Sequence, residues 1–156
     1  MRRVVLMGLL LMWMGWALAG GEPMQEEQKV RIFTTEETYE DVIENIKMAI
    51  IDRGMLVSGT LHISDMLNRT GPDLGFPDVF EKAESVEFCS ALVSHKMAQV
   101  APENVVICPF TIAVYTTKAQ PEAVYVAYRL PRLAGDADQV TGEILEMMDG
   151  IVEDSI

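Results

Sequence analysis

The 156-residue chain contains few of the side chains that carry most enzyme and cofactor chemistry, with only two cysteines and two histidines. It has no Gly-x-Ser-x-Gly, His-Glu-x-x-His or phosphate-loop motif, so the sequence gives no indication of hydrolysis or nucleotide binding. It also has neither the Cys-x-x-Cys pair of thioredoxin-like proteins nor the Cys-x-x-Cys-His motif that attaches haem covalently. These absences favour a binding protein over an enzyme.

Basic residues are also scarce, because 12 lysines and arginines face 24 aspartates and glutamates. The formal net charge is −12, and no basic stripe is present that could neutralise phosphates. This balance argues against binding to nucleic acid or to anionic lipid surfaces. It is typical of a soluble protein whose molecules repel one another.

The one long apolar run lies at the start of the chain, in "MRRVVLMGLLLMWMGWALAG". Two arginines, an apolar centre shorter than the roughly 20 residues of a spanning helix, and a small-x-small exit predict a secretory signal peptide. We therefore expect a signal peptide at residues 1–19, a flexible leader at 20–28 and a single domain at 29–156. The mature protein would be periplasmic or secreted and not inserted in a membrane, with a net charge of −14.

Apolar periodicity along the mature chain alternates between the periods of helices and strands. The clearest helix is "TTEETYEDVIENIKMAIIDRG", with Thr35 as its cap and Gly54 as its stop. The run "NVVICPFTIAVYTT" predicts one long strand, in which Pro109 lacks a donor and is expected at a sheet edge or a bulge. In chain order we predict a strand at 29–34, a helix at 35–53, a strand at 55–63, a long loop, a strand at 85–92, a helix at 94–104, strands at 104–117 and 123–130, and a helix at 136–156.

This order predicts an α+β fold, in which a single sheet has helices packed on one face. Strand-helix-strand units would be followed by a C-terminal hairpin and helix. The hairpin tyrosines Tyr115, Tyr125 and Tyr128 are expected on the open face. Because an open face of this kind needs a cover, we expect a second copy of the chain to provide it, as a homodimer.

The stretch "SDMLNRTGPDLGFPDVFEKAES" is rich in glycine and proline. It is predicted to begin with a short helical turn capped by Ser64 and to continue as a loop through Thr70–Phe80. Loops of this length are often lids or binding loops. We therefore expect a small ligand to lie between the sheet and this loop, near His62 and Cys89.

Several segments resemble a known family. These are "ETYEDVIENIKMAIIDRGMLV", "EFCSALVSHKMAQVAPENVVICPFTIAVY" and "AVYVAYR", which are similar to the uncharacterised family called domain of unknown function 302 (DUF302). Cys89, Cys108 and Pro109 carry the most specific part of the resemblance, which spans Arg31 to Arg129. It implies a compact α+β fold that can dimerise, and no agreed activity.

The two cysteines admit several interpretations. Cys89 and Cys108 lie in apolar runs that are expected to form neighbouring strands, and such strands bring Cα atoms within the 4.4–6.8 Å range that a disulfide needs. Two buried free thiols, packed as small apolar residues, are an equal alternative. Redox catalysis usually needs a thiol at a helix N-terminus, whereas the predicted helix begins at Ser94, five residues after Cys89.

A metal or haem site is a further alternative. Two sulfurs and two imidazoles match a tetrahedral zinc or copper site by ligand type, although their spacing matches no known zinc finger. The candidate ligands of a transition metal or haem are Cys89, Cys108, His62 and His95, with Met66 and Met97 nearby.

Two functional hypotheses follow. The first is a small exported protein that binds a small ligand, a metal or haem near the long loop, as a homodimer. The second is a redox protein of the cell envelope, in which Cys89 and Cys108 form a disulfide/thiol pair or hold a metal.

Overall fold

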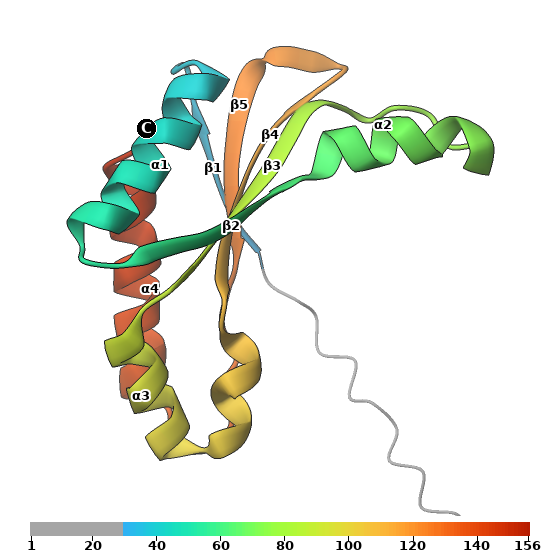
Figure 1. Ribbon diagram of the computed structural model, residues 1–156. Helices are drawn as coiled ribbons and strands as arrows, with labels where there is room; N and C mark the ends of the chain where they lie inside the picture. The colour runs from blue at the N-terminus through green and yellow to red at the C-terminus, as the bar shows by residue number, and fades with distance from the viewer. Residues whose placement is uncertain (1–29) are drawn as a thin grey trace, which may run out of the picture.

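The computed structural model describes residues 30–156, which form one five-stranded sheet with four α-helices (Figure 1). The predicted signal peptide at 1–19 and the leader at 20–28 lie outside the described residues. In chain order the elements are β1 (Val30–Thr35), α1 (Tyr39–Asp52), β2 (Leu56–His62), α2 (Ile63–Leu74), β3 (Phe80–Cys89), α3 (Ala91–Val100), the 3-10 helix η1 (Pro102–Ile107), β4 (Phe110–Thr117), β5 (Gln120–Arg129) and α4 (Asp138–Glu153).

The sheet has the strand order β1-β5-β4-β3-β2, and every neighbouring pair is antiparallel. The first two strands therefore lie at opposite edges, and α1 connects them across the sheet. The segment from α3 to η1 connects β3 to its neighbour β4. This arrangement confirms the predicted α+β fold and the predicted pairing of the two cysteine-bearing segments.

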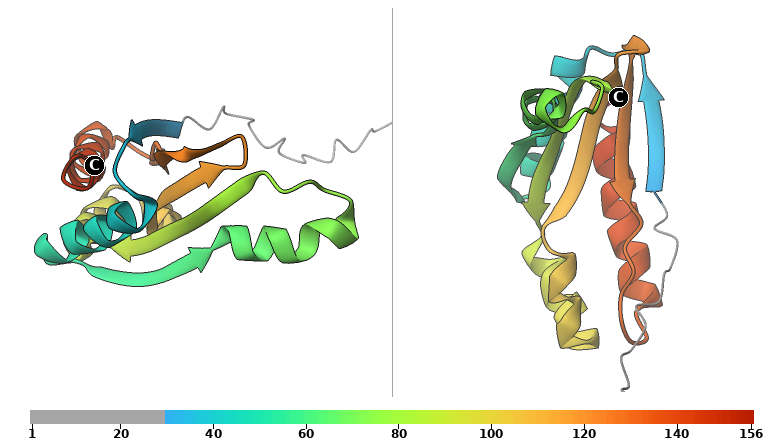
Figure 2. Two further views of the ribbon diagram at one scale, coloured as in Figure 1. Left: turned by 90° about the horizontal axis from the view of Figure 1, so that it is seen from above. Right: turned by 90° about the vertical axis from the view of Figure 1, so that its right-hand side faces the viewer.

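Helices α1, α3 and α4 cover one face of the sheet (Figures 1 and 2). Alternate residues of the central strands point into this layer, where Phe88, Ile112 and Val126 are fully buried. The apolar stripe predicted for the first helix is confirmed, because its members are all buried: Tyr39, Val42, Ile43, Ile46, Ala49 and Ile50. Burial of each large apolar side chain contributes about 1.5–3 kcal/mol.

The first helix begins three residues later than predicted. Its N-cap is Thr38, whose hydroxyl accepts a hydrogen bond from the backbone N–H of Asp41 at 3.2 Å. Thr35 instead ends β1, and its hydroxyl accepts from the N–H of Glu37. The predicted stop at Gly54 is confirmed by its φ of 72°, since glycine adopts this left-handed conformation at little cost.

The predicted loop from Thr70 to Phe80 is wrong in most of its length. Helix α2 continues to Leu74, and β3 already begins at Phe80. The hydroxyl of Ser64 does not cap the helix but donates to the carbonyl of Ala83 on β3. Gly71 allows the turn beyond the helix, because its carbonyl accepts from the N–H of Phe76 and a Cβ there would lie 3.1 Å from the Phe76 oxygen.

Helix α2 projects from the face opposite the other helices, near the β2–β3 edge (Figure 2). The rest of this open face carries small and aromatic side chains, among them Tyr115 and Tyr125, whose rings stack at 5.1 Å. Tyr128 was predicted on this face but lies on the opposite one, where it is buried. Strand alternation requires this, since Tyr125 and Tyr128 are three residues apart.

The predicted long strand at 104–117 is divided in two. Its first part is the 3-10 helix η1, and β4 starts only at Phe110. Cys108 therefore lies between these elements and not within a strand, and its peptide bond to Pro109 is cis. Pro109 is accordingly neither on an edge strand nor in a bulge, but immediately before a central strand, where no ladder donor is required.

Candidate functional site

The two strands of the C-terminal hairpin separate at one end of the sheet. Strands β4 and β5 pair in regular register from Tyr115 opposite Tyr125 to Ala113 opposite Ala127. Within residues 30–156 no ladder pair joins them beyond that point, whereas β5 still pairs with β1, and β4 with β3. The sheet therefore splits into two parts here, and the right-hand view of Figure 2 shows the strands diverging toward η1.

Two prolines prevent the ladder from resuming beyond the split. If the register of the hairpin continued, Pro109 would face Pro131. Neither residue has a backbone N–H, so neither can donate to an antiparallel ladder. The strands therefore do not pair again at this level, and Thr111 and Arg129 line the gap between them.

A pocket of about 210 Å³ occupies this gap. Its apolar side chains come from four segments: Val106 and Ile107 of η1, Phe110 of β4, Leu130 after β5, and Ile144 and Met148 of α4. Thr111, Arg129 and Arg132 line it as well, together with the two prolines. Among the described residues no acidic side chain lines the pocket, although acids outnumber bases two to one in the chain.

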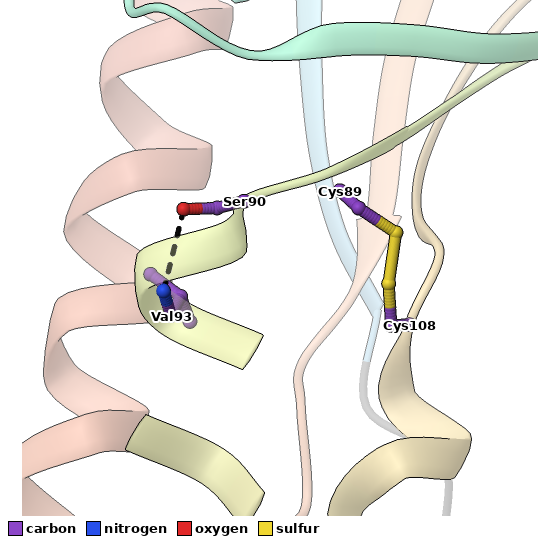
Figure 3. The surroundings of a disulfide bond; sticks show 4 residues. All are labelled: Cys89, Ser90, Val93 and Cys108. Atoms are coloured by element: carbon purple, nitrogen blue, oxygen red, sulfur yellow. Dashed lines mark hydrogen bonds between the residues drawn. A yellow bond between two sulfur atoms is a disulfide. The ribbon is translucent and has the colours of Figure 1, made fainter. Parts of the chain in front are cut away.

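A disulfide holds one wall of the pocket. Cys89 at the end of β3 is bonded to Cys108, with a Cα–Cα distance of 6.1 Å (Figure 3). The bond decides between the alternatives left open by the sequence, since neither cysteine is free. It ties the segment between η1 and β4, which contributes Ile107 and Pro109 to the pocket, to the adjacent strand.

The helix that follows Cys89 begins earlier than predicted. The N-cap of α3 is Ser90, whose hydroxyl accepts from the N–H of Val93, and not Ser94. Cys89 therefore lies one residue before the cap. Figure 3 shows its side chain turned away from the helix and toward Cys108.

A buried asparagine holds the same wall from the other side. The Asn104 side chain is 2% exposed, and its amide nitrogen donates to the carbonyls of Met97 and Ala134. Its amide oxygen accepts from the N–H of Ala134 at 2.7 Å. Asn104 thus joins η1 to the end of α3 and to the segment that leads into α4. Asn104 was not predicted from the sequence, because no local pattern distinguishes it from a surface asparagine.

The floor of the pocket is anchored by a polar cluster on the helix-covered face. Asp149 of α4 accepts hydrogen bonds from the hydroxyl of Tyr128 on β5 and from the guanidinium of Arg31 on β1. Burial by itself would raise the pKa of Asp149, but the hydrogen bonds from Tyr128 and Arg31 outweigh it and lower that pKa. Burial, followed by the bond to Asp149, raises the pKa of Tyr128. The cluster holds α4, and with it Met148, against the split end of the sheet.

The sequence-predicted ligands are not all brought together. His62 pairs with Glu84 at one end of the β2–β3 ladder, with its Nδ1 3.5 Å from a carboxylate oxygen, whereas Cys89 pairs with Leu56 at the other end. Five residue steps along a strand separate these ends by about 17 Å. One small ligand therefore cannot contact both His62 and Cys89. The expectation of a ligand near both residues is wrong.

The remaining candidate ligands are also dispersed. His95 is exposed on α3, Met97 is buried in the core at 1% exposure, and Met66 is exposed on α2. Within residues 30–156 no group of three or more histidine, cysteine, aspartate or glutamate side chains is arranged to hold a metal ion.

In the same part of the chain, no helix has the length and apolarity that crossing a bilayer requires.

The fold places the protein among small α+β proteins with one antiparallel sheet. A solved structure with this fold is the "uncharacterized conserved protein DUF302 from Bacillus stearothermophilus", with a TM-score of 0.68 at 11% sequence identity. The match covers 81% of the present chain and 98% of the other. No curated protein matches the sequence.

Residues 31–155 match the family described as "Domain of unknown function DUF302". The chain therefore belongs to the DUF302 family, which confirms the resemblance identified from its cysteine-bearing segments. The residues that line the pocket, Arg129 among them, were not predicted as site residues from the sequence. Pro109 and Pro131 fall at the same level only through the register shift between Tyr115 and Thr117, so their spacing from the turn could not have located the pocket.

Proposed function

We propose that this protein binds a small molecule in the pocket between the diverging ends of β4 and β5. One observation carries the proposal: β4 and β5 stop pairing beyond Ala113 and Ala127, and a pocket lies between the separated strand ends. Ligand sites are typically concave and mostly apolar, with a few polar groups that orient the ligand. A volume of about 210 Å³ lies below the usual range for drug-sized ligands, which points to a small compound.

The surrounding structure supports a preformed site. A disulfide, a satisfied buried asparagine and the Asp149 cluster each hold one part of the lining. Walls held in this way lose little conformational freedom on binding, which is a main cost of association.

The test uses two phenylalanine substitutions on β4. Thr111 lines the pocket, whereas Thr117 lies on the same face of the same strand at the hairpin turn. In a ligand-observed NMR screen of small anionic, cationic and neutral compounds, wild type and Thr117→Phe should bind the same compounds. Thr111→Phe should reduce their affinity by about tenfold or more, because the added ring occupies the pocket. If no compound separates the two variants, the proposed site is wrong.

We also propose that the protein is a homodimer formed through the open face of the sheet. Support comes from α2, which projects from that face and exposes an apolar stripe that includes Leu67 (40% exposed) and Leu74 (66%). The edge strand β1 exposes Ile32 (55%) on the same face. In a two-fold arrangement each α2 would pack against the sheet of the other copy, so that both apolar surfaces are covered by one self-complementary contact.

Light scattering coupled to size-exclusion chromatography tests the dimer. Wild type should elute at twice the mass of the monomer, and Ile32→Glu should shift it to the monomer by placing a charge in the contact. Met48→Glu is the matched control, because Met48 is 53% exposed but lies on α1, on the other face. A wild type that stays monomeric at high concentration would contradict the proposal.

A redox role for the cysteine pair is the second candidate, since both cysteines are partly exposed and already bonded to one another. A cycling disulfide and a structural one differ in reduction potential, with structural bonds typically below about −300 mV. Equilibration with thiol redox buffers, followed by mass spectrometry of alkylated protein, measures it. A potential below that value would exclude cycling.

A further inference from the structure

We infer that the ligand of the β4–β5 pocket is an amphiphilic monocarboxylate, with its carboxylate at Arg129 and its apolar part against Phe110, Ile144 and Met148. This inference rests on the proposed function and adds the chemical class of the ligand. It follows from the charge of the pocket mouth, the apolarity of its floor and its volume.

Among the described residues, Arg129 at the mouth of the pocket differs from most basic side chains in its lack of an ion pair. Six lysines and arginines of residues 30–156 form ion pairs with carboxylates, as Lys96 does with Glu143 and Arg53 with Asp154. Within the same residues no carboxylate lies within ion-pair distance of Arg129, although the protein is strongly acidic. An arginine without a carboxylate partner at the mouth of a pocket is a ready acceptor site for an anion, because its planar fork matches a carboxylate in two hydrogen bonds.

Arg132 adds a second guanidinium to the lining, three residues further along the chain. The absence of acidic residues from the lining matters as much as the two arginines. The protein has twice as many acids as bases, so most of its surface repels anions. The pocket is lined by arginines and by no described acidic residue, so an anion is repelled least there.

The floor of the pocket selects for an apolar tail. Phe110, Ile144 and Met148 are buried at 5%, 0% and 2% exposure, and each belongs to the main core cluster. An apolar ligand tail packed on these side chains would remove its own surface from water, at about 25 cal/mol per Å². A free inorganic anion gains nothing from this floor, and a neutral hydrocarbon gains nothing from Arg129.

The volume sets the size of the ligand. A pocket of about 210 Å³ holds a chain of several carbons or one aromatic ring, but not a long-chain lipid. Hexanoate is therefore the probe, with 1-hexanol as the neutral compound of equal chain length and acetate as the head group alone.

The experiment measures the affinity of the three probes by ligand-observed NMR, with amide chemical shifts mapping the site. Hexanoate should bind about tenfold more tightly than 1-hexanol, and acetate should show no binding at the same concentrations. Arg129→Gln should lower hexanoate affinity by about tenfold, the loss of one charge-assisted contact, and leave 1-hexanol unchanged. The control is Arg69→Gln on α2, an exposed arginine away from the pocket, which should change neither affinity.

The outcomes separate the two levels of the proposal. If 1-hexanol binds as tightly as hexanoate and Arg129→Gln has no effect, the ligand class is wrong, but the pocket remains a binding site. If acetate binds as well as hexanoate, the apolar floor plays no part and the amphiphile is excluded. If none of the probes binds, and no compound in the wider screen distinguishes Thr111→Phe from Thr117→Phe, both the class and the proposed function fail.

Discussion

The two ends of the β4–β5 hairpin are held together in different ways. At the turn, backbone pairing continues and Tyr115 stacks on Tyr125. At the other end the ladder stops, and the strands are kept in place by a disulfide, by Asn104 and by Asp149. A pocket in the middle of a sheet requires that hydrogen bonds be given up, and long-range contacts then supply the order that the ladder no longer provides.

The sharpest test of this difference is removal of the disulfide by Cys89→Ala together with Cys108→Ala. We expect the free energy of unfolding to fall by about 3 kcal/mol, the chain-entropy value for a loop of this length. Denaturant titration gives the loss, and amide hydrogen exchange should show it first in η1 and β4 near Phe110. Equal loss of protection at the turn would show that the two ends are not held separately.

A smaller effect is expected from Asn104→Ala. The substitution removes the hydrogen bonds of the side chain to the carbonyls of Met97 and Ala134 and to the N–H of Ala134, which should cost about 2 kcal/mol. The control is Asn45→Ala on α1, a partly exposed site. Hexanoate affinity should fall in the first variant only, because Asn104 supports the η1 wall. An unchanged unfolding free energy would exclude this supporting role.

The smallest of the three effects, about 1 kcal/mol, is expected from Asp149→Asn, because the cluster is partly exposed. The pKa of Asp149 is lowered in the folded protein, so its stabilising effect is complete above the ordinary aspartate value near 4 and is lost as the pH falls through the lowered pKa. Wild type and variant should therefore differ most at neutral pH and converge in acid. Urea titrations at a series of pH values measure this, with Glu153→Gln, an exposed site on α4, as the control. A difference that does not depend on pH would show that the carboxylate charge is not involved.

The two faces of the sheet differ in how well the sequence predicted them. The helix-covered face was predicted almost completely, because the α1 stripe from Tyr39 to Ile50 has an unbroken helical period. On the open face, Gly71 and Pro72 obscured a helix whose apolar residues Ile63, Leu67 and Leu74 also recur at helical spacing. Local breaker residues there were outweighed by the packing of the helix against β3, as in the bond from Ser64 to Ala83.

The candidate site was predicted in part. The sequence placed Cys89 and Cys108 on neighbouring segments, but it left their bonding open and placed the ligand beside His62. Arg129 was not singled out, since an arginine at the end of an alternating strand is ordinary in itself. Its significance depends on the gap beside it and on the lack, within residues 30–156, of a carboxylate at ion-pair distance.

The sequence by itself determined the family, the α+β class, the three helices that cover one face and the proximity of the two cysteines. These follow from periodicity, from caps and stops such as Gly54, and from segments specific to DUF302, all of which are local properties of the chain. Only the tertiary structure decided the disulfide, the helix α2 and the pocket. Each of these depends on which residues of distant segments come into contact, as Cys89 and Cys108 do in the disulfide, and spacing along one segment does not contain that information.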